Sequence, residues 1–269
     1  MNGRKNGFLS KIYLALIMFF LYALIGVMIF FSFNNGRTIV WKGFSLKWYE
    51  ELFSNELIIE SFRNTLIVAF IASIFATVLG TLAALGVYSM KNKAAKGLIQ
   101  NVTNLPLLNP EIVTGLSLML LFAAMRFAGG WVTLIIAHIT FCVPSVFLSI
   151  LPKLRQLNKS LYEAAMDLGC SPAKAFQKVV IPEIMPGIIT GFLMAFTYSI
   201  DDFVISYFTA GNLPTLPITI YSMVKKRVSP EINALSTLLF LAVFLVLLVT
   251  NVRAIRKEKE LERKRRAVK

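Results

Sequence analysis

The chain has 269 residues, of which 57% are hydrophobic and only 16% are charged. Soluble domains carry charges on about a quarter of their residues, so this composition excludes an ordinary soluble protein and indicates an integral membrane protein. The formal net charge is +14. The basic residues cluster at the ends of apolar runs, which is typical of a membrane protein and argues against a nucleic-acid partner.

Six apolar runs are long enough to cross about 30 Å of hydrocarbon. They predict transmembrane helices at residues 12–33, 62–88, 105–125, 131–151, 184–208 and 235–252. The first run is followed by Asn-Asn-Gly instead of the small residues of a cleavage site, so we expect an uncleaved span. The expected fold is an all-α membrane protein.

Domain boundaries follow from these runs. We expect an N-terminal segment at 1–11, a six-span domain at 12–252 that contains a polar loop at 152–182, and a charged tail at 253–269.

The charge distribution predicts the orientation of the chain. Six spans would place both termini on the same side as the loops at 91–96 and 152–182. These four segments hold 20 of the 28 Lys and Arg residues. Because short cytoplasmic segments are enriched in Lys and Arg, we expect both termini and both loops in the cytoplasm, although the basic cluster at 225–227 runs against this trend.

The sequence shows no catalytic machinery. A phosphate-binding loop needs a Gly-Lys pair, which does not occur, and neither a metal-binding cluster nor a nucleophile–base arrangement is apparent. His138 lies within an expected span, where a hydrogen-bonding role is favoured over ligand binding, and Cys142 and Cys170 are not expected to pair. Uphill transport would therefore need a partner or an ion gradient.

The polar loop predicts two short amphipathic helices. An apolar face with helical spacing comprises Leu161, Ala164, Ala165 and Leu168. Glu163 and Asp167, four residues apart, share a neighbouring face. Gly169 suits the left-handed end of the first helix, and a Ser-Pro pair suits the start of the second. The pattern by itself equally fits a connector lying on the membrane surface.

Two adjacent aspartates, Asp201 and Asp202, lie inside the fifth expected span. A single Asp near a helix centre costs about 3 kcal/mol on insertion scales, and such residues usually line a watery path or have partners. Neighbours on a helix point about 100° apart, so one can face a cavity while the other lies in a helix contact. With Tyr198 and Phe203 beside them, the carboxylates suit an organic cation. A proton-coupling role, or bonding to a neighbouring helix or to Arg126, remains open.

The start of the fifth span is shaped by glycine and proline. Gly187 and Gly191 form a Gly-x-x-x-Gly spacing that permits close helix approach. Pro182 and Pro186 set the angle at which the loop enters the span. A rigid junction there would transmit a push on the loop to the helix that bears the aspartates.

The loop residues also carry a family resemblance. Glu163-Ala164-Ala165, then Gly169, then Ile181-Pro182 resembles the EAA loop of ABC-importer permeases. The segments at 138–144, 199–204, 216–224 and 229–234 are similar to those of PotC-type permeases of spermidine/putrescine importers. This resemblance extends from the first loop to the sixth span and leaves out the tail.

The resemblance implies a type I ABC-importer permease fold in a bacterial cell membrane. It implies an ATPase-coupling role for Glu163, Ala164, Ala165 and Gly169, to which we add Asp167. The chemistry of Asp201, Asp202, Tyr198 and Phe203, taken with the polyamine cargo of the family, predicts a substrate path at these residues. The resemblance further implies a heterodimer with a PotB-like permease, two copies of a PotA-like cytoplasmic ATPase that binds ATP and Mg, and a PotD-like extracytoplasmic polyamine-binding protein. This chain itself would hold no cofactor. An importer of another cargo, an ion-coupled carrier or channel, and a scaffold subunit are the alternatives.

Overall fold

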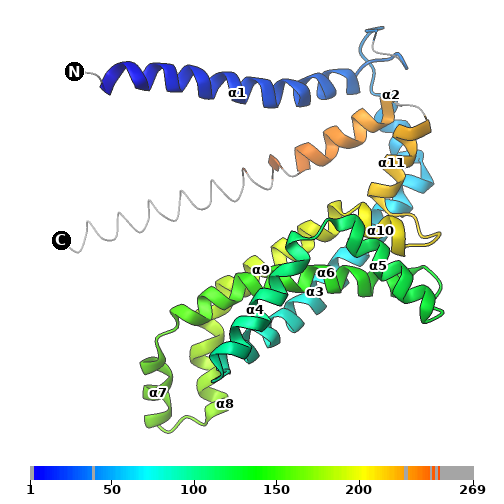
Figure 1. Ribbon diagram of the computed structural model, residues 1–269. Coiled ribbons are helices and arrows are strands. Elements are labelled where there is room, and N and C mark those ends of the chain that lie inside the picture. Colours follow the sequence, from blue (N-terminus) through cyan, green and yellow to red (C-terminus); the bar gives the residue numbers. More distant parts are fainter. Residues whose placement is uncertain (1–2, 38–39, 227–229, 243, 246–247, 249–269) are drawn as a thin grey trace. The chain divides into compact units, whose positions relative to one another are not determined.

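The computed structural model describes residues 3–37, 40–226, 230–242, 244–245 and 248 (Figure 1). Regular structure in these ranges is helical, apart from one isolated bridge between Asn34 and Phe44. The all-α prediction is therefore confirmed. The chain divides into two compact units, one made of Met1–Glu56 with Ser222–Lys269 and the other of Leu57–Tyr221.

The unit that contains the N-terminus is built on α1 (Gly3–Ser32), α2 (Lys47–Ser54) and an apolar helix at Pro230–Ala242. Trp48 of α2 is buried, and its indole Nε1 donates to the carbonyl oxygen of Asn34 at 2.6 Å. The side-chain oxygen of Asn34 accepts from the backbone N–H of Lys42 at 2.8 Å. These bonds fold the segment after α1 back onto α2.

The second unit contains most of the helices. They are α3 (Glu56–Ser89), α4 (Lys93–Leu108), α5 (Glu111–Ala124), α6 (Trp131–Gln156), α7 (Lys159–Asp167), α8 (Pro172–Ala175), the π-helical turn η1 (Phe176–Val180), α9 (Ile181–Asp201) and α10 (Val204–Thr209). The boundary between the units falls within α11 (Leu216–Lys226), after Tyr221. In Figure 1, α3, α4, α6 and α9 lie side by side, with α7 and α8 at one end and α5 and α10 toward the other.

The core of this unit forms around α6, because glycines let α3 and α9 approach it closely. A Cβ atom on Gly80 of α3 would lie 2.7 Å from Cγ1 of Val146. On α9, a Cβ on Gly187 would lie 3.0 Å from the carbonyl oxygen of Ser149, and one on Gly191 would lie 3.2 Å from the Cα of Val146. The Gly-x-x-x-Gly spacing thus permits the close helix approach that the sequence predicts.

Four helices are long and apolar enough to cross a membrane: Ser10–Ser32, Glu56–Ser89, Trp131–Gln156 and Pro172–Asp201. They correspond to the first, second, fourth and fifth expected spans, and the protein is an integral membrane protein. The third and sixth expected spans correspond to shorter apolar helices, Glu111–Ala124 and Pro230–Ala242. The count of six spans therefore stays a prediction.

Three expected boundaries differ from the structure. Residues 91–96, expected as a loop, lead into α4, whose first turn is capped because Asn92 Oδ1 accepts from the N–H groups of Ala94 and Ala95. The third span, expected at 105–125, begins only after Pro110, which terminates the preceding helix. The fifth span, expected to be continuous over 184–208, is interrupted at residues 202–203. The last part of the sixth expected span and the tail at 253–269 lie outside the described residues.

Candidate functional site

The loop between α6 and α9 contains one separate short helix, α7, whereas the second expected helix, α8, continues through η1 into α9. Asn158 caps α7, accepting from the N–H of Ser160 at 3.0 Å. Gly169 has φ +86°, and the N–H of Cys170 donates to the carbonyl oxygen of Ala165 at 3.1 Å, which closes the helix in the manner of a Schellman motif. Ser171 occupies the N-cap position of α8, but its side chain makes no capping bond.

The outer surface of α7 is exposed and partly apolar. Leu168 is 87% exposed, and Leu161 and Met166 are also exposed. Glu163, Ala164 and Asp167 are exposed as well, whereas Ala165 is half-buried. Exposed apolar side chains and carboxylates thus lie together on and next to α7.

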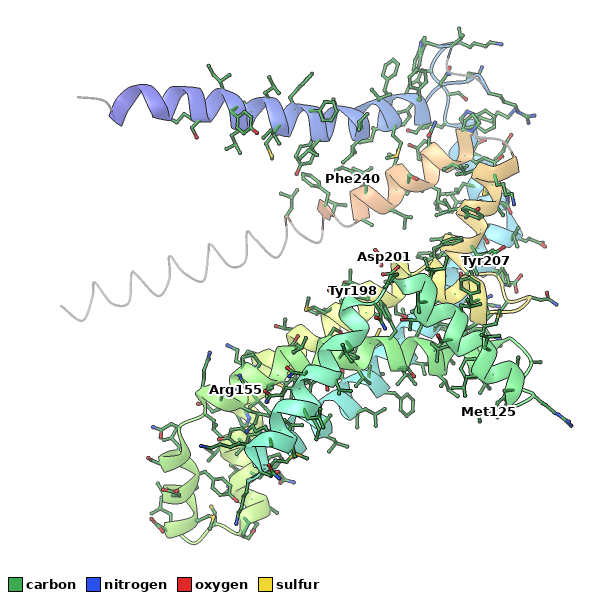
Figure 2. All side chains as sticks on the ribbon, viewed as in Figure 1. Met125, Arg155, Tyr198, Asp201, Tyr207 and Phe240 are labelled. Atoms are coloured by element: carbon green, nitrogen blue, oxygen red, sulfur yellow. The ribbon has the colours of Figure 1, made fainter. Side chains whose placement is uncertain are left out.

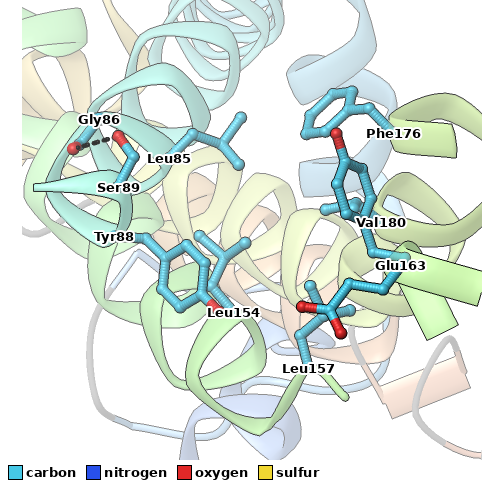
Figure 3. A pocket seen from close by; sticks show the side chains of 10 residues that line it. Leu85, Gly86, Tyr88, Ser89, Leu154, Leu157, Glu163, Phe176 and Val180 are labelled. Carbon is cyan, nitrogen blue, oxygen red and sulfur yellow. Dashed lines mark hydrogen bonds between the residues drawn. The ribbon is translucent and has the colours of Figure 1, made fainter. Parts of the chain in front are cut away.

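A cavity of about 520 Å³ separates α7 from the helix bundle (Figure 3). It is lined by Leu85, Gly86, Tyr88 and Ser89 of α3, Leu154 and Leu157 at the end of α6, Tyr162 and Glu163 of α7, and Phe176 and Val180 of η1. Figure 3 shows the Glu163 carboxylate directed toward Leu157 at the edge of this cavity. Glu163 therefore lies at the edge of a cavity that α3 and α7 both line.

One helical path runs from the loop to the aspartates. The residues Pro172–Asp201 form a continuous helix of 30 residues, with a π-helical turn at Phe176–Val180. At that turn, the N–H of Ile181 bonds to the carbonyl oxygen of Phe176, five residues before it. Pro182 follows at once and cannot donate a backbone hydrogen bond. A π-turn in front of a proline re-routes the bonds without interrupting the helix, so α8 and α9 are mechanically connected.

The helix ends where the two aspartates begin to differ. Asp202 leaves the helical conformation with φ −64° and ψ 117°. Its carboxylate accepts from the N–H of Ile205 at 3.2 Å and from the N–H of Ser206 at 2.8 Å. The hydroxyl of Ser206 also donates to it at 3.0 Å. Asp202 therefore caps α10, which starts a new helix in the middle of the expected span.

His138 of α6 is buried beside this break and completes a polar network. Its Nδ1 lies 2.6 Å from the hydroxyl oxygen of Ser199, and its Nε2 lies 3.0 Å from that of Ser206. Nε2 is also 3.4 Å from Oδ2 of Asp202. The hydrogen-bonding role predicted for His138 is confirmed. Of the alternatives for the aspartates, bonding to a neighbouring helix applies to Asp202, through α6.

The remaining site residues lie on the accessible side of the break. Asp201 is exposed, whereas Asp202 is only 6% exposed. The ring of Phe203 lies 4.6 Å from that of Tyr221 and 5.5 Å from that of Tyr207, and Tyr198 packs against Phe141 at 6.2 Å. Figure 2 shows Tyr198, Asp201 and Tyr207 far from Arg155, which is beside the loop helices.

Glu111 was not among the site residues expected from the sequence. In the structure Glu111 opens α5. One turn later this helix packs on α10 at Gly115, where a Cβ would lie 3.4 Å from the Cα of Ile205. An acidic residue directly after a proline at the start of an apolar run was the available signal.

Comparison with known proteins identifies the family. A model described as "binding-protein-dependent transport system inner membrane component" matches residues 76–257. This chain belongs to that family. The family consists of the non-catalytic permease subunits of ABC transporters, so the predicted resemblance is confirmed at this level.

Two curated relatives are similar over most of the permease. The putrescine transport system permease protein PotI of Escherichia coli (strain K12) is 42% identical over 236 residues, which is 84% of each chain. The spermidine/putrescine transport system permease protein PotC of the same organism is 36% identical over 255 residues, covering 93% of this chain and 94% of that one. Among solved structures, a bacterial ABC transporter involved in the import of the acidic polysaccharide alginate matches with a TM-score of 0.72 and 14% identity, covering 92% of this chain and 96% of that one. That likeness shows the fold, which is that of type I ABC-importer permeases.

Proposed function

We propose that this chain is the permease subunit of an ATP-driven importer that carries polyamines such as putrescine or spermidine into the cytoplasm. The observation that carries the proposal is the continuous helix Pro172–Asp201, which joins the EAA loop of the family to an exposed carboxylate at the opposite end of the bundle. The names of the two curated relatives support the cargo class.

The coupling step uses the loop helices. Glu163, Ala164, Ala165, Asp167 and Gly169 form the contact with a cytoplasmic PotA-like ATPase, present in two copies, which binds and hydrolyses ATP with Mg. The exposed Leu168 adds apolar contact area to this surface. Closure of the ATPase pushes α7 and α8 across the cavity beside Glu163, and α9 transmits the displacement as a rigid helix.

The cargo step uses the charges at the helix break. A polyamine presents ammonium groups separated by methylene chains, so it needs carboxylates next to apolar or aromatic surface. Asp201 and Glu111, which opens the helix packed on α10, supply the charge, and Phe203, Tyr207 and Tyr198 supply aromatic faces. Asp202 contributes to the local negative potential, while its oxygen atoms hold α10 in place.

The proposed function also specifies the partners of the chain and its orientation in the membrane. A PotB-like permease completes the translocation path, and a PotD-like binding protein delivers cargo from outside. A solved relative of this fold is described in complex with a ligand-bound periplasmic protein, which supports the last partner. Both termini and the loop at 152–182 lie on the cytoplasmic side of a bacterial cell membrane.

Uptake measurements in cells that lack other polyamine importers test this function. We expect uptake of labelled putrescine or spermidine that requires ATP and persists when the ion gradients are collapsed. The Asp201→Asn variant should take up less, whereas Glu60→Gln, at an exposed carboxylate of α3 without an assigned role, should match the unmodified protein. Uptake that follows the ion gradient with ATP maintained would support an ion-coupled carrier. ATP-dependent uptake of an uncharged solute but of no amine would support an importer of another cargo.

A further inference from the structure

One side chain of α6 contacts both sides of the helix break at residues 202–203. His138, only 2% exposed, contacts Ser199 in the last turn of α9 and Ser206 in the first turn of α10. The hydroxyl of Ser206 donates to Asp202, so it accepts from Nε2–H of the imidazole, and Nδ1 accepts from the hydroxyl of Ser199. A neutral histidine thus satisfies every bond in this network, and it spans both sides of the break.

This connection matters because the helix is interrupted between α9 and α10. Their junction has two non-helical residues, Asp202 and Phe203. On the far side of α10, the hydroxyl of Thr133 on α6 donates to the carbonyl oxygen of Thr209 at 2.8 Å. The short helix is therefore attached to α6 near both of its ends, by Thr133 at one and by His138 at the other.

The attachment also fixes the direction of the neighbouring carboxylate. Adjacent residues at the end of a helix point about 100° apart, so holding Asp202 against His138 turns Asp201 outward. Phe203, the next residue, is held at the same time against Tyr207 and Tyr221. The carboxylate of Asp201 and the ring of Phe203 thus have a fixed spacing. This spacing depends on the angle between α9 and α10.

We propose that His138 is a positioning residue for amine recognition: it holds the break between α9 and α10 so that Asp201 and Phe203 face the cargo path together. This inference rests on the proposed function for the identity of the ligand, an organic polyamine. It adds that recognition depends on a buried histidine that does not touch the cargo, and that its effect is exerted through Asp201.

A double-mutant cycle in the assembled importer tests the proposal, with labelled putrescine as the probe. The variants are His138→Ala, Asp201→Asn and the combination, and the readout is the half-saturating putrescine concentration measured separately from the maximal rate. Loss of one ionised partner should raise the half-saturating concentration roughly tenfold for Asp201→Asn. We expect a similar increase for His138→Ala, and no further increase in the double variant, because both changes remove the same carboxylate contact.

The matched control is Ser145→Ala. Ser145 is also buried on α6, but its hydroxyl donates to the carbonyl oxygen of Cys142 in the same helix at 2.7 Å. Its half-saturating concentration should equal that of the unmodified protein. If His138→Ala does not assemble, Ser206→Ala removes the single hydroxyl that joins His138 to Asp202, and it enters the same cycle with the same expectation.

The outcomes separate this inference from the function on which it rests. If the increase in half-saturating concentration of the double variant is the product of the two single increases, His138 acts independently of Asp201. That result would overturn the positioning role and leave the cation path intact. A His138→Ala variant with unchanged half-saturation and a lower maximal rate would overturn it as well. If Asp201→Asn alone has no effect on any amine, the cation path fails, and the positioning role fails with it.

Discussion

Substitution of Asp202 should lower the stability of the protein, whereas substitution of Asp201 should lower amine uptake and leave the stability nearly unchanged. Replacing Asp202 with alanine removes three hydrogen bonds and leaves the N–H groups of Ile205 and Ser206 without their acceptor in a buried position. Each orphaned group costs about 1–3 kcal/mol, and removal of a buried carboxylate returns part of that cost, so we expect a net loss of about 2–4 kcal/mol. Asp201 is exposed, and its replacement should change stability by about 0.5 kcal/mol or less.

Thermal unfolding of the detergent-solubilised permease measures this difference. The midpoint of Asp202→Ala should fall by about 4–16 °C, given about 2–4 °C for each kcal/mol in a chain of this size class. Asp201→Ala is the matched control and should melt with the unmodified protein while losing amine uptake. Equal midpoints for the two variants would refute the assignment of Asp202 to the cap of α10.

Three further substitutions test the coupling loop and the packing of α9. Glu163→Ala should leave the permease in the membrane and bound to its partners but lower ATP-driven uptake, and normal uptake would remove Glu163 from the coupling contact. Gly86→Leu adds a side chain where no atom lies within 4 Å of the new Cβ, and it fills part of the cavity beside α7. Uptake should slow, although the higher helix propensity of leucine stabilises the helix by about 1 kcal/mol. Gly97→Leu, equally unobstructed but outside the cavity, is its control and should transport normally. Gly187→Val would bring Cβ within 3.0 Å of the Ser149 carbonyl oxygen and should cost about 1–3 kcal/mol in thermal unfolding; an unchanged midpoint would contradict the close approach of α9 to α6.

The long apolar helices could be predicted from the sequence because the hydrocarbon core sets both their length and their composition. The end of α7 and the start of α8 could also be predicted, since Gly169 and the Ser-Pro pair mark them with local backbone chemistry. The continuation of α8 into α9 was not expected. The segment before the third span was predicted wrongly. The lysines of residues 91–96 suggested a loop, whereas Asn92 caps a helix that begins at Lys93.

The break after Asp201 could not be predicted in the same way. Residues 184–208 read as one apolar run, with neither glycine nor proline at positions 202–203. The helix ends there because Asp202 bonds forward to α10 and because His138, more than 60 positions earlier in the chain, bonds to both sides. Polarity alone marked the aspartates as functional. Their division into one buried and one exposed carboxylate depends on which helix packs beside them, and that is a tertiary contact.

The central claim is that this chain forms the amine path of an ATP-driven importer. Its most direct test is reconstitution of the permease with its partner permease, ATPase and binding protein in proteoliposomes, followed by measurement of ATP hydrolysis with a panel of cations. We predict that putrescine or spermidine stimulates hydrolysis, that simple inorganic cations do not, and that Asp201→Asn lowers the stimulation. Hydrolysis that no polyamine stimulates, in an assembly that binds its partners normally, would contradict the account.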